Sequence, residues 1–222
     1  MILGDVSPYA IASDPARSEE CLESLREFVE GGGGLLFQAG EYDNPYSFEG
    51  TALEDLLPVI LDATTRASFS GDTRREQRPT LEDPAAPHQI VRLHSDIETN
   101  RRLWETEGGL RGFYWYQPVA RAKPGAQVLL RHPTDEGRHG RFPLLSVGYY
   151  PSGRTMFLAP DSTWMWRYRF GDRYHERFWR NAVPWLAPGR PKSGNRRVRL
   201  ARPQARRSLA TPLTLPARGA RH

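Results

Sequence analysis

The chain has 222 residues, of which 38% are hydrophobic and 11% aromatic, a composition that suits one folded domain or one domain with a tail. No run of 18 apolar residues is present, and the first residues lack the basic and apolar regions of a signal peptide, so the sequence predicts neither a membrane span nor a leader. The formal net charge of +5 comes from residues 188–222, which hold ten of the 31 Lys and Arg residues and no acidic residue; residues 1–187 carry 21 basic against 26 acidic side chains. The basic pI therefore gives no reason to expect nucleic-acid binding by the folded part, and residues 188–222 are expected to form a disordered basic tail.

The first 40 residues predict two strands separated by a helix. Met1–Val6 is apolar, and because a domain rarely begins inside a strand, we expect the chain to be truncated at its N-terminus. Ser13–Pro15 offers a helix cap followed by proline, and the helix carries Cys21, a core or half-buried thiol that has no partner for an internal disulfide. Gly31–Gly34 comes after this helix and before the buried strand Leu35–Phe37, an order that predicts a tight turn and not a phosphate-binding loop.

The middle of the chain predicts short elements joined by long loops. Residues 53–57 and 93–104 each suggest a short helix, whereas residues 62–87 are polar and proline-rich and are expected to be an excursion or insertion. Aromatic and β-branched residues predict strands at Phe113–Tyr116 and Gln127–Leu130.

The segment from Leu144 onward predicts a hairpin followed by one α/β unit. The strands Leu144–Tyr149 and Arg154–Ala159 flank the turn Pro151–Gly153. The second strand ends in the polar turn Asp161–Thr163, and apolar residues at helical spacing then predict a helix over Asp172–Leu186.

Acidic residues follow three of the predicted strands. Because the carboxyl ends of parallel strands meet at one edge of a sheet, we expect Asp5, Glu41 and Asp161 to lie close together, where they could bind a cation or orient a hydroxylated or amine ligand. The alternative is that each acid caps the loop or helix that follows it. The candidate ligand-binding residues combine these acids with the residues that follow the third strand: Asp5, Glu41, Asp161, Ser162, Thr163, Trp164 and Arg167.

No metal site and no cofactor are predicted. The six histidines form neither H-x-H nor H-E-x-x-H, and His132 and His139, which flank a glycine-containing loop, are expected to face solvent. Ser162 lacks the G-x-S-x-G setting of a serine hydrolase.

Several segments occur in an order that is familiar from one protein family: ILGDVSP, GGGGLLFQAGEYDNP, GTALEDLLPV, AKPGAQVLLRHP, PLLSVGYYPSGRTMFLAPDSTWMWR and FWRNAVPWLA. This series, which covers residues 1–187, resembles the glutamine amidotransferase-like domain of large bacterial proteins, in the class I glutamine amidotransferase-like superfamily near its ThuA-like branch. The resemblance implies a flavodoxin-like three-layer α/β/α sandwich with a mostly parallel sheet. It also implies an origin in long, often membrane-associated chains, where the partners are other domains or subunits; the compartment itself is not predicted.

The catalytic residues of active members of that superfamily are absent at the matching positions. The resemblance places the nucleophilic cysteine on an elbow that corresponds to Phe37–Glu41, which has no cysteine, and the histidine at Ala159–Asp161, which has no histidine. The sequence therefore predicts a non-catalytic ligand- or protein-binding module of a larger envelope-associated protein. Two alternatives remain open: a hydrolase that uses Glu41, Asp161 and Asp172, and nucleic-acid contact through the tail.

Overall fold

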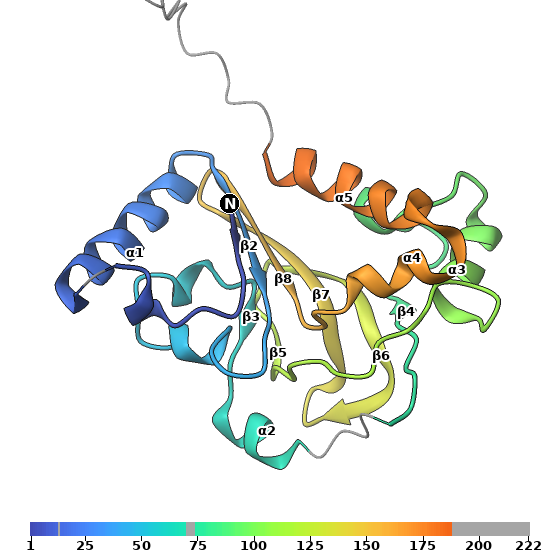
Figure 1. The fold of residues 1–222 in the computed structure, drawn as a ribbon, viewed down its shortest axis with the longest axis horizontal. Coiled ribbons are helices and arrows are strands. Elements are labelled where there is room, and N and C mark those ends of the chain that lie inside the picture. The colour runs from blue at the N-terminus through green and yellow to red at the C-terminus, as the bar shows by residue number, and fades with distance from the viewer. Residues whose placement is uncertain (13, 70–73, 188–222) are drawn as a thin grey trace, which may run out of the picture. The chain divides into compact units, whose positions relative to one another are not determined.

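The computed structural model describes residues 1–12, 14–69 and 74–187 (Figure 1). The predicted tail, residues 188–222, lies outside them, as does Ser13. No helix in the described part of the chain is long and apolar enough to cross a membrane.

Six strands form the main sheet in the order β1-β2-β8-β7-β6-β4, and two more form a small antiparallel pair, β3 with β5. The bounds of the strands are β1 Ile2–Leu3, β2 Gly34–Gln38, β3 Val59–Ile60, β4 Thr80–Leu81, β5 Arg121–Ala122, β6 Gln127–Gly137, β7 Gly140–Tyr150 and β8 Gly153–Leu158. Strands β1, β2 and β8 run parallel to one another, as the sequence predicts. The chain thus has a mixed α/β fold.

The expectation of a mostly parallel sheet is wrong, because three of the five strand pairings in the main sheet are antiparallel. Short turns join β6 to β7 and β7 to β8, and a short turn can link only antiparallel strands, since a parallel pair needs a long crossover. The hairpin predicted around Pro151–Gly153 is confirmed, and it is this hairpin that turns the sheet antiparallel.

Five α-helices and several short 3₁₀ turns are described. The helices are α1 Pro15–Glu30, α2 Ala63–Ser68, α3 Ile97–Glu105, α4 Arg167–Phe170 and α5 Asp172–Leu186, and the 3₁₀ turns are Pro8–Ala10, Tyr46–Phe48, Glu54–Leu56, Gln89–Val91 and Thr163–Trp166. Asp14 caps α1, since its Oδ1 accepts a hydrogen bond of 2.9 Å from the Arg17 amide, and Pro15 occupies the first turn.

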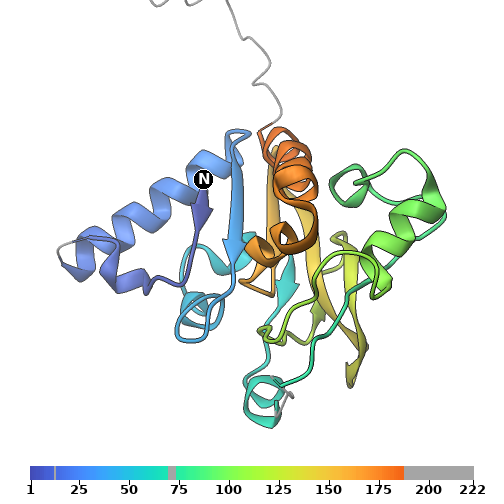
Figure 2. The ribbon, with the colours of Figure 1, turned by 45° about the vertical axis from the view of Figure 1, so that its right-hand side comes forward.

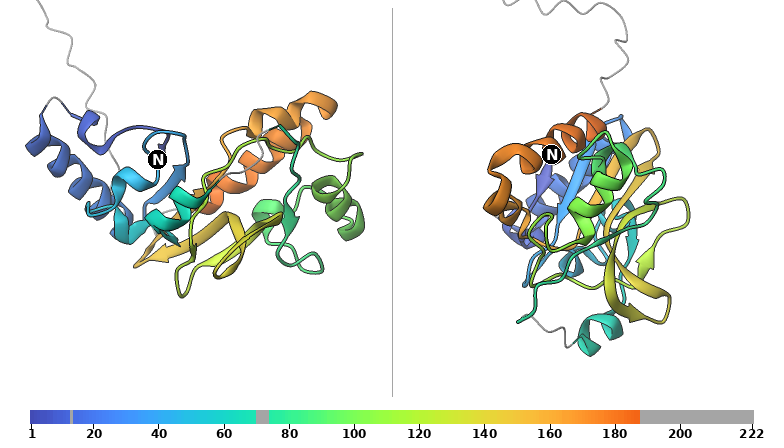
Figure 3. Two further views of the ribbon diagram at one scale, coloured as in Figure 1. Left: turned by 90° about the horizontal axis from the view of Figure 1, so that it is seen from below. Right: turned by 90° about the vertical axis from the view of Figure 1, so that its right-hand side faces the viewer.

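Helices α1 and α5 cover opposite faces of the parallel strands (Figure 2). A Cβ placed on Gly34 would lie 1.9 Å from the carbonyl oxygen of Leu186 in α5, and one placed on Gly153 would lie 2.0 Å from that of Val29 in α1. Gly34 is paired with Arg154, so the preceding residue, Gly153, points to the other face. Both glycines therefore let a helix backbone approach the sheet. Figure 3 shows α4 and α5 on one side of β6 and β7.

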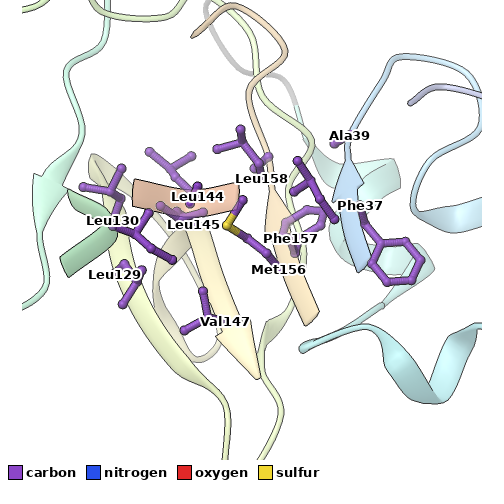
Figure 4. Close-up of a cluster of buried hydrophobic side chains, with 14 of the residues drawn as sticks. Phe37, Ala39, Leu129, Leu130, Leu144, Leu145, Val147, Met156, Phe157 and Leu158 are labelled. Atoms are coloured by element: carbon purple, nitrogen blue, oxygen red, sulfur yellow. The ribbon is translucent and has the colours of Figure 1, made fainter. Parts of the chain in front are cut away.

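The central strands are buried on both faces. In β2 four successive residues are buried, and five of the six residues of β8 are (Figure 4). Coverage by helices on both faces explains why these strands are continuous apolar runs without alternation.

Two predictions for the middle of the chain need correction. Phe113–Tyr116 is not a strand; it makes one isolated bridge, between Phe113 and Gln77, although Phe113 and Tyr116 are buried. The segment 62–87, expected to be an excursion, contains α2 and also β4, which pairs with β6 at the edge of the main sheet.

Candidate functional site

Strands β1, β2 and β8 end level with one another, which places the residues after them at one edge of the sheet. Leu3 of β1 is paired with Phe37, which is paired in turn with Phe157 of β8. The structure brings Asp5 and Asp161 near enough for the charge of Asp5 to raise the pKa of Asp161. Glu41 is exposed on the loop after β2. Glu41 follows Gly40, which packs against the Asp5 side chain, so all three acids lie at this edge, and an electrostatic interaction is resolved between Asp5 and Asp161.

Asp5 holds the loop that follows β2. Its Oδ1 accepts hydrogen bonds from the amides of Asp43 and Asn44, at 2.7 and 3.0 Å, and its Oδ2 accepts one from Tyr42 at 3.1 Å. Loss of hydration would raise the pKa of Asp5, but these three bonds and the charge of Arg66 outweigh it and hold the pKa below its usual range. The carboxylate is therefore already used as a loop cap.

The elbow Phe37–Glu41 is closed by its neighbours. Gln38 donates from Nε2 to the Pro160 carbonyl at 2.6 Å, and Ala39 is buried. A Cβ on Gly40 would lie 2.0 Å from Cγ of Asp5. No side chain fits at Gly40 while Asp5 keeps its place, and Glu41 is the first elbow residue that is open to solvent.

Asp161 is the acid of this edge whose pKa lies above its usual range. Partial shielding of its carboxyl from water raises its pKa and is the largest contribution. A hydrogen bond from its own amide opposes this, the negative charge of Asp5 raises the pKa further, and Ser162 makes a smaller opposing contribution. A carboxyl with a raised pKa next to an ionised one is the arrangement that holds a proton in many catalytic and binding sites.

The residues after Asp161 divide into buried and exposed ones. Thr163 is buried, and the buried Oγ of Ser162 has no hydrogen bond that meets ordinary geometry within the described residues. Both line a cavity of only about 10 Å³, which has room for at most one water. Trp164 instead is 64% exposed. Of these three candidates, only Trp164 is accessible to a ligand.

Arg167 is paired away from the edge. Its Nε forms an ion pair with Oδ1 of Asp172, the first residue of α5. Asp172, named as a further acid for hydrolysis, therefore has an arginine as its ion-pair partner.

Two other residues at this edge could not be identified from the sequence pattern. Tyr42 is 78% exposed on the loop that Asp5 caps. Arg66, from α2, donates from Nη2 to the Tyr42 carbonyl at 3.2 Å, and its charge lowers the pKa of Asp5. It comes from the segment predicted to be an excursion, so local pattern could not connect it with the strand ends.

His132 is fully buried, which corrects the expectation that it faces solvent; His139 is exposed as expected. Phe113 and Tyr116 pack on its ring, with centroids 5.6 and 4.8 Å away, and its Nδ1 accepts from the Asp135 amide at 2.7 Å. Burial lowers the pKa of His132, against an opposing contribution from the Asp135 charge.

No group of three or more His, Cys, Asp or Glu side chains within residues 1–12, 14–69 and 74–187 is arranged to hold a metal ion.

Comparisons with known proteins bear on the fold. No model of a known protein family matches the chain, and no curated protein matches it. Among solved structures, the cytoplasmic protein STM1381 of Salmonella typhimurium LT2 is 22% identical, with a TM-score of 0.55, and STM3548 of Salmonella typhimurium is 23% identical, with a TM-score of 0.52. Each alignment covers 83% of this chain and 70% of the other. At such identities the similarity concerns the fold alone.

Proposed function

We propose that residues 1–187 are a non-catalytic glutamine amidotransferase-like domain, flavodoxin-like in its parallel half, that binds a ligand or a partner at the carboxyl ends of β1, β2 and β8. The observation that carries the proposal is the closed elbow, where Gly40 packs on the Asp5 side chain and no cysteine is present. Cys21, the one thiol, lies within α1. An acyl-transfer nucleophile has to reach its substrate, and this elbow presents none.

The chemistry of the edge favours a polar or cationic ligand. Its exposed groups are the carboxylates of Glu41 and Asp161 and the rings of Tyr42 and Trp164. A carboxylate attracts an ammonium group, and contact of a cation with an aromatic face contributes about 0.5–2 kcal/mol. Hydroxylated ligands such as sugars also suit acids beside aromatic rings. The resemblance to domains of larger envelope-associated proteins adds neighbouring domains or subunits as the proposed partners.

The experiment that tests the proposal is chemical-shift mapping of the isotope-labelled chain with a panel of amines, sugars and metal ions. We expect shifts at Glu41, Tyr42 and Trp164 with an amine or a sugar, and Trp164→Ala should abolish them. Val183→Ala, on the exposed surface of α5, is the control and should leave them in place. Shifts confined to the opposite end of the sheet would contradict the placement of the site.

The raised pKa of Asp161 supports hydrolase activity as a second candidate, with Asp161 as general acid and Glu41 as its partner carboxylate. A panel of chromogenic glycosides and esters tests it. Turnover that is lost in Asp161→Asn and kept in Asp172→Asn would favour this second function over binding alone.

A further inference from the structure

Three arginines from separate parts of the chain surround a cavity that is distinct from the strand edge. Arg78 comes from the segment before β4, Arg111 from the segment after α3, and Arg169 from α4. The cavity measures about 70 Å³, and the rest of its wall is formed by Glu76, Glu107, Gly109, Leu110 and Tyr168. Since a buried water needs about 10–15 Å³ of such volume, there is room for several waters or for one small polyatomic anion.

Neighbouring groups fix the positions of the three guanidinium groups. Arg78 donates from Nη2 to Oε1 of Glu76 at 2.8 Å, and Arg111 donates from Nη2 to the Tyr114 hydroxyl at 2.8 Å. The Arg111 guanidinium also lies 4.7 Å from the centroid of the Tyr168 ring.

Arg169 donates from Nη1 to the backbone carbonyl of Glu107. All three guanidinium groups are therefore held in place before any ligand arrives.

Two of these arginines have buried donors that the described residues leave unsatisfied. The Nε atoms of Arg78 and Arg111 are buried and have no hydrogen-bond partner, and the nearest carboxylate oxygen to Arg111 Nε, Oε2 of Glu76, is 3.9 Å away. A buried charged donor without an acceptor is costly and rare, so both guanidinium groups have hydrogen-bonding capacity that their protein partners leave unused. The cavity lining also holds three arginines against two acids, Glu76 and Glu107, which leaves it positively charged.

We propose that this cavity binds an oxyanion, the phosphate or carboxylate group of a ligand, through Arg78, Arg111 and Arg169. The planar fork of a guanidinium group matches the paired oxygens of such anions, and charge-assisted hydrogen bonds of this kind are the strong ones. The site does not depend on the ligand proposed for the strand edge.

Arginine Nε–Hε resonances of the full chain, followed while inorganic phosphate is added at constant ionic strength, test the proposal. We expect a saturable shift of the Arg78 and Arg111 signals, and none with chloride. Arg169→Gln should weaken the phosphate affinity about tenfold or more, because it removes a charge-assisted interaction. Arg173→Gln, an exposed arginine of α5, makes the same change of net charge and should leave the affinity unchanged.

A parallel titration with acetate separates a phosphate-bearing from a carboxylate-bearing ligand, and tighter binding of either anion supports the site. Absence of a saturable shift with both anions would mean that water fills the cavity, and would overturn the proposal. An equal loss of affinity in Arg173→Gln would also overturn it, since general electrostatic attraction would then explain the binding. The titration of the unaltered chain decides the matter even if a variant does not fold.

Discussion

The carboxylate of Asp5 determines how the edge of the parallel strands can be used. Position after a strand predicts that Asp5 lies at this edge, and it does. Whether such an acid meets a ligand or caps a loop depends on the path of residues 42–44, which only the folded structure reveals. The same limit applies to Ser162, whose place after β8 is predictable but whose burial is not.

At the residue scale, the packing of Gly40 against Asp5 gives the first prediction. Gly40→Ala would put a Cβ 2.0 Å from Asp5 Cγ, so the side chain must move and release the amides that it caps. We expect the free energy of unfolding to fall by about 1–3 kcal/mol, as overpacking usually costs. Gly4→Ala is the control, because nothing lies within 4 Å of an added Cβ there. Urea denaturation measures the free energy of unfolding of both variants. An equally small loss in Gly40→Ala and Gly4→Ala would show that the elbow is open.

The buried His132 predicts a loss of stability in mild acid. Burial lowers its pKa in the folded protein, whereas the unfolded chain has the ordinary histidine pKa of about 6.5. The unfolded state therefore takes up a proton first, so the stability that His132 contributes is complete above about pH 6.5 and declines as the pH falls toward the folded-state pKa. Unfolding measured from about pH 7 to pH 5 should show this decline.

The matched variants are His132→Phe and His139→Phe. His132→Phe should lower the free energy of unfolding, because the Thr134 and Asp135 amides lose an acceptor. The free energy of unfolding of this variant should nevertheless depend less on pH than that of the unaltered protein. His139 is exposed, so His139→Phe should keep the original dependence. An unchanged slope in His132→Phe would mean that His88 and His175, whose pKa values burial also lowers, account for the decline.

At the scale of elements, strong local signals were predictable and partnerships between distant segments were not. The cap at Asp14, the apolar runs of β2 and β8, and the turn at Pro151–Gly153 all specify structure within a few residues. β4 is two residues long inside a proline-rich segment, and its partners in β6, Leu130 and Arg131, lie about 50 residues further on, so no local pattern marks it.

The aromatic run at residues 113–116 shows the converse error. Its composition fits a pleated, half-buried surface, which is what strand propensity measures, but Phe113 and Tyr116 bury their rings against His132 and the run does not join a ladder.

Close approach of helices to the sheet predicts that Gly34 and Gly153 are both intolerant of a side chain. Alanine at Gly34 would meet the Leu186 backbone at 1.9 Å, and alanine at Gly153 would meet the Val29 carbonyl at 2.0 Å. Since neither backbone can give way without undocking a helix, we expect each variant to lose about 1–3 kcal/mol or more. Gly108→Ala, with its nearest neighbour 3.9 Å away, is the control. Thermal unfolding compares the three, and wild-type stability of either sheet variant would contradict the described docking.

At the scale of the whole molecule, the main sheet joins a parallel half to an antiparallel one. The candidate site lies at the carboxyl ends of β1, β2 and β8, the strands that α1 and α5 cover. The sheet continues beyond these strands through β7, β6 and β4. The existence of the parallel strands is predictable from the sequence, because each is an apolar run with a helix or turn beside it, whereas the pairing of β2 with the distant β8 is not. The antiparallel extension follows from the short turns between β6, β7 and β8. Each turn is a local feature, but its effect on the direction of the strands across the whole sheet cannot be read from a local pattern.

The proposed function rests on an elbow that presents no nucleophile, and the release of ammonia from glutamine tests this most directly. The unaltered full chain should release no more ammonia than a reaction without protein, and Cys21→Ser, which alters the one thiol in a helix away from the elbow, should give the same result. Circular dichroism of both proteins confirms that each is folded during the assay. Steady release of ammonia by the unaltered chain that disappears in Cys21→Ser would contradict the account, because it would make the thiol of α1 a working nucleophile.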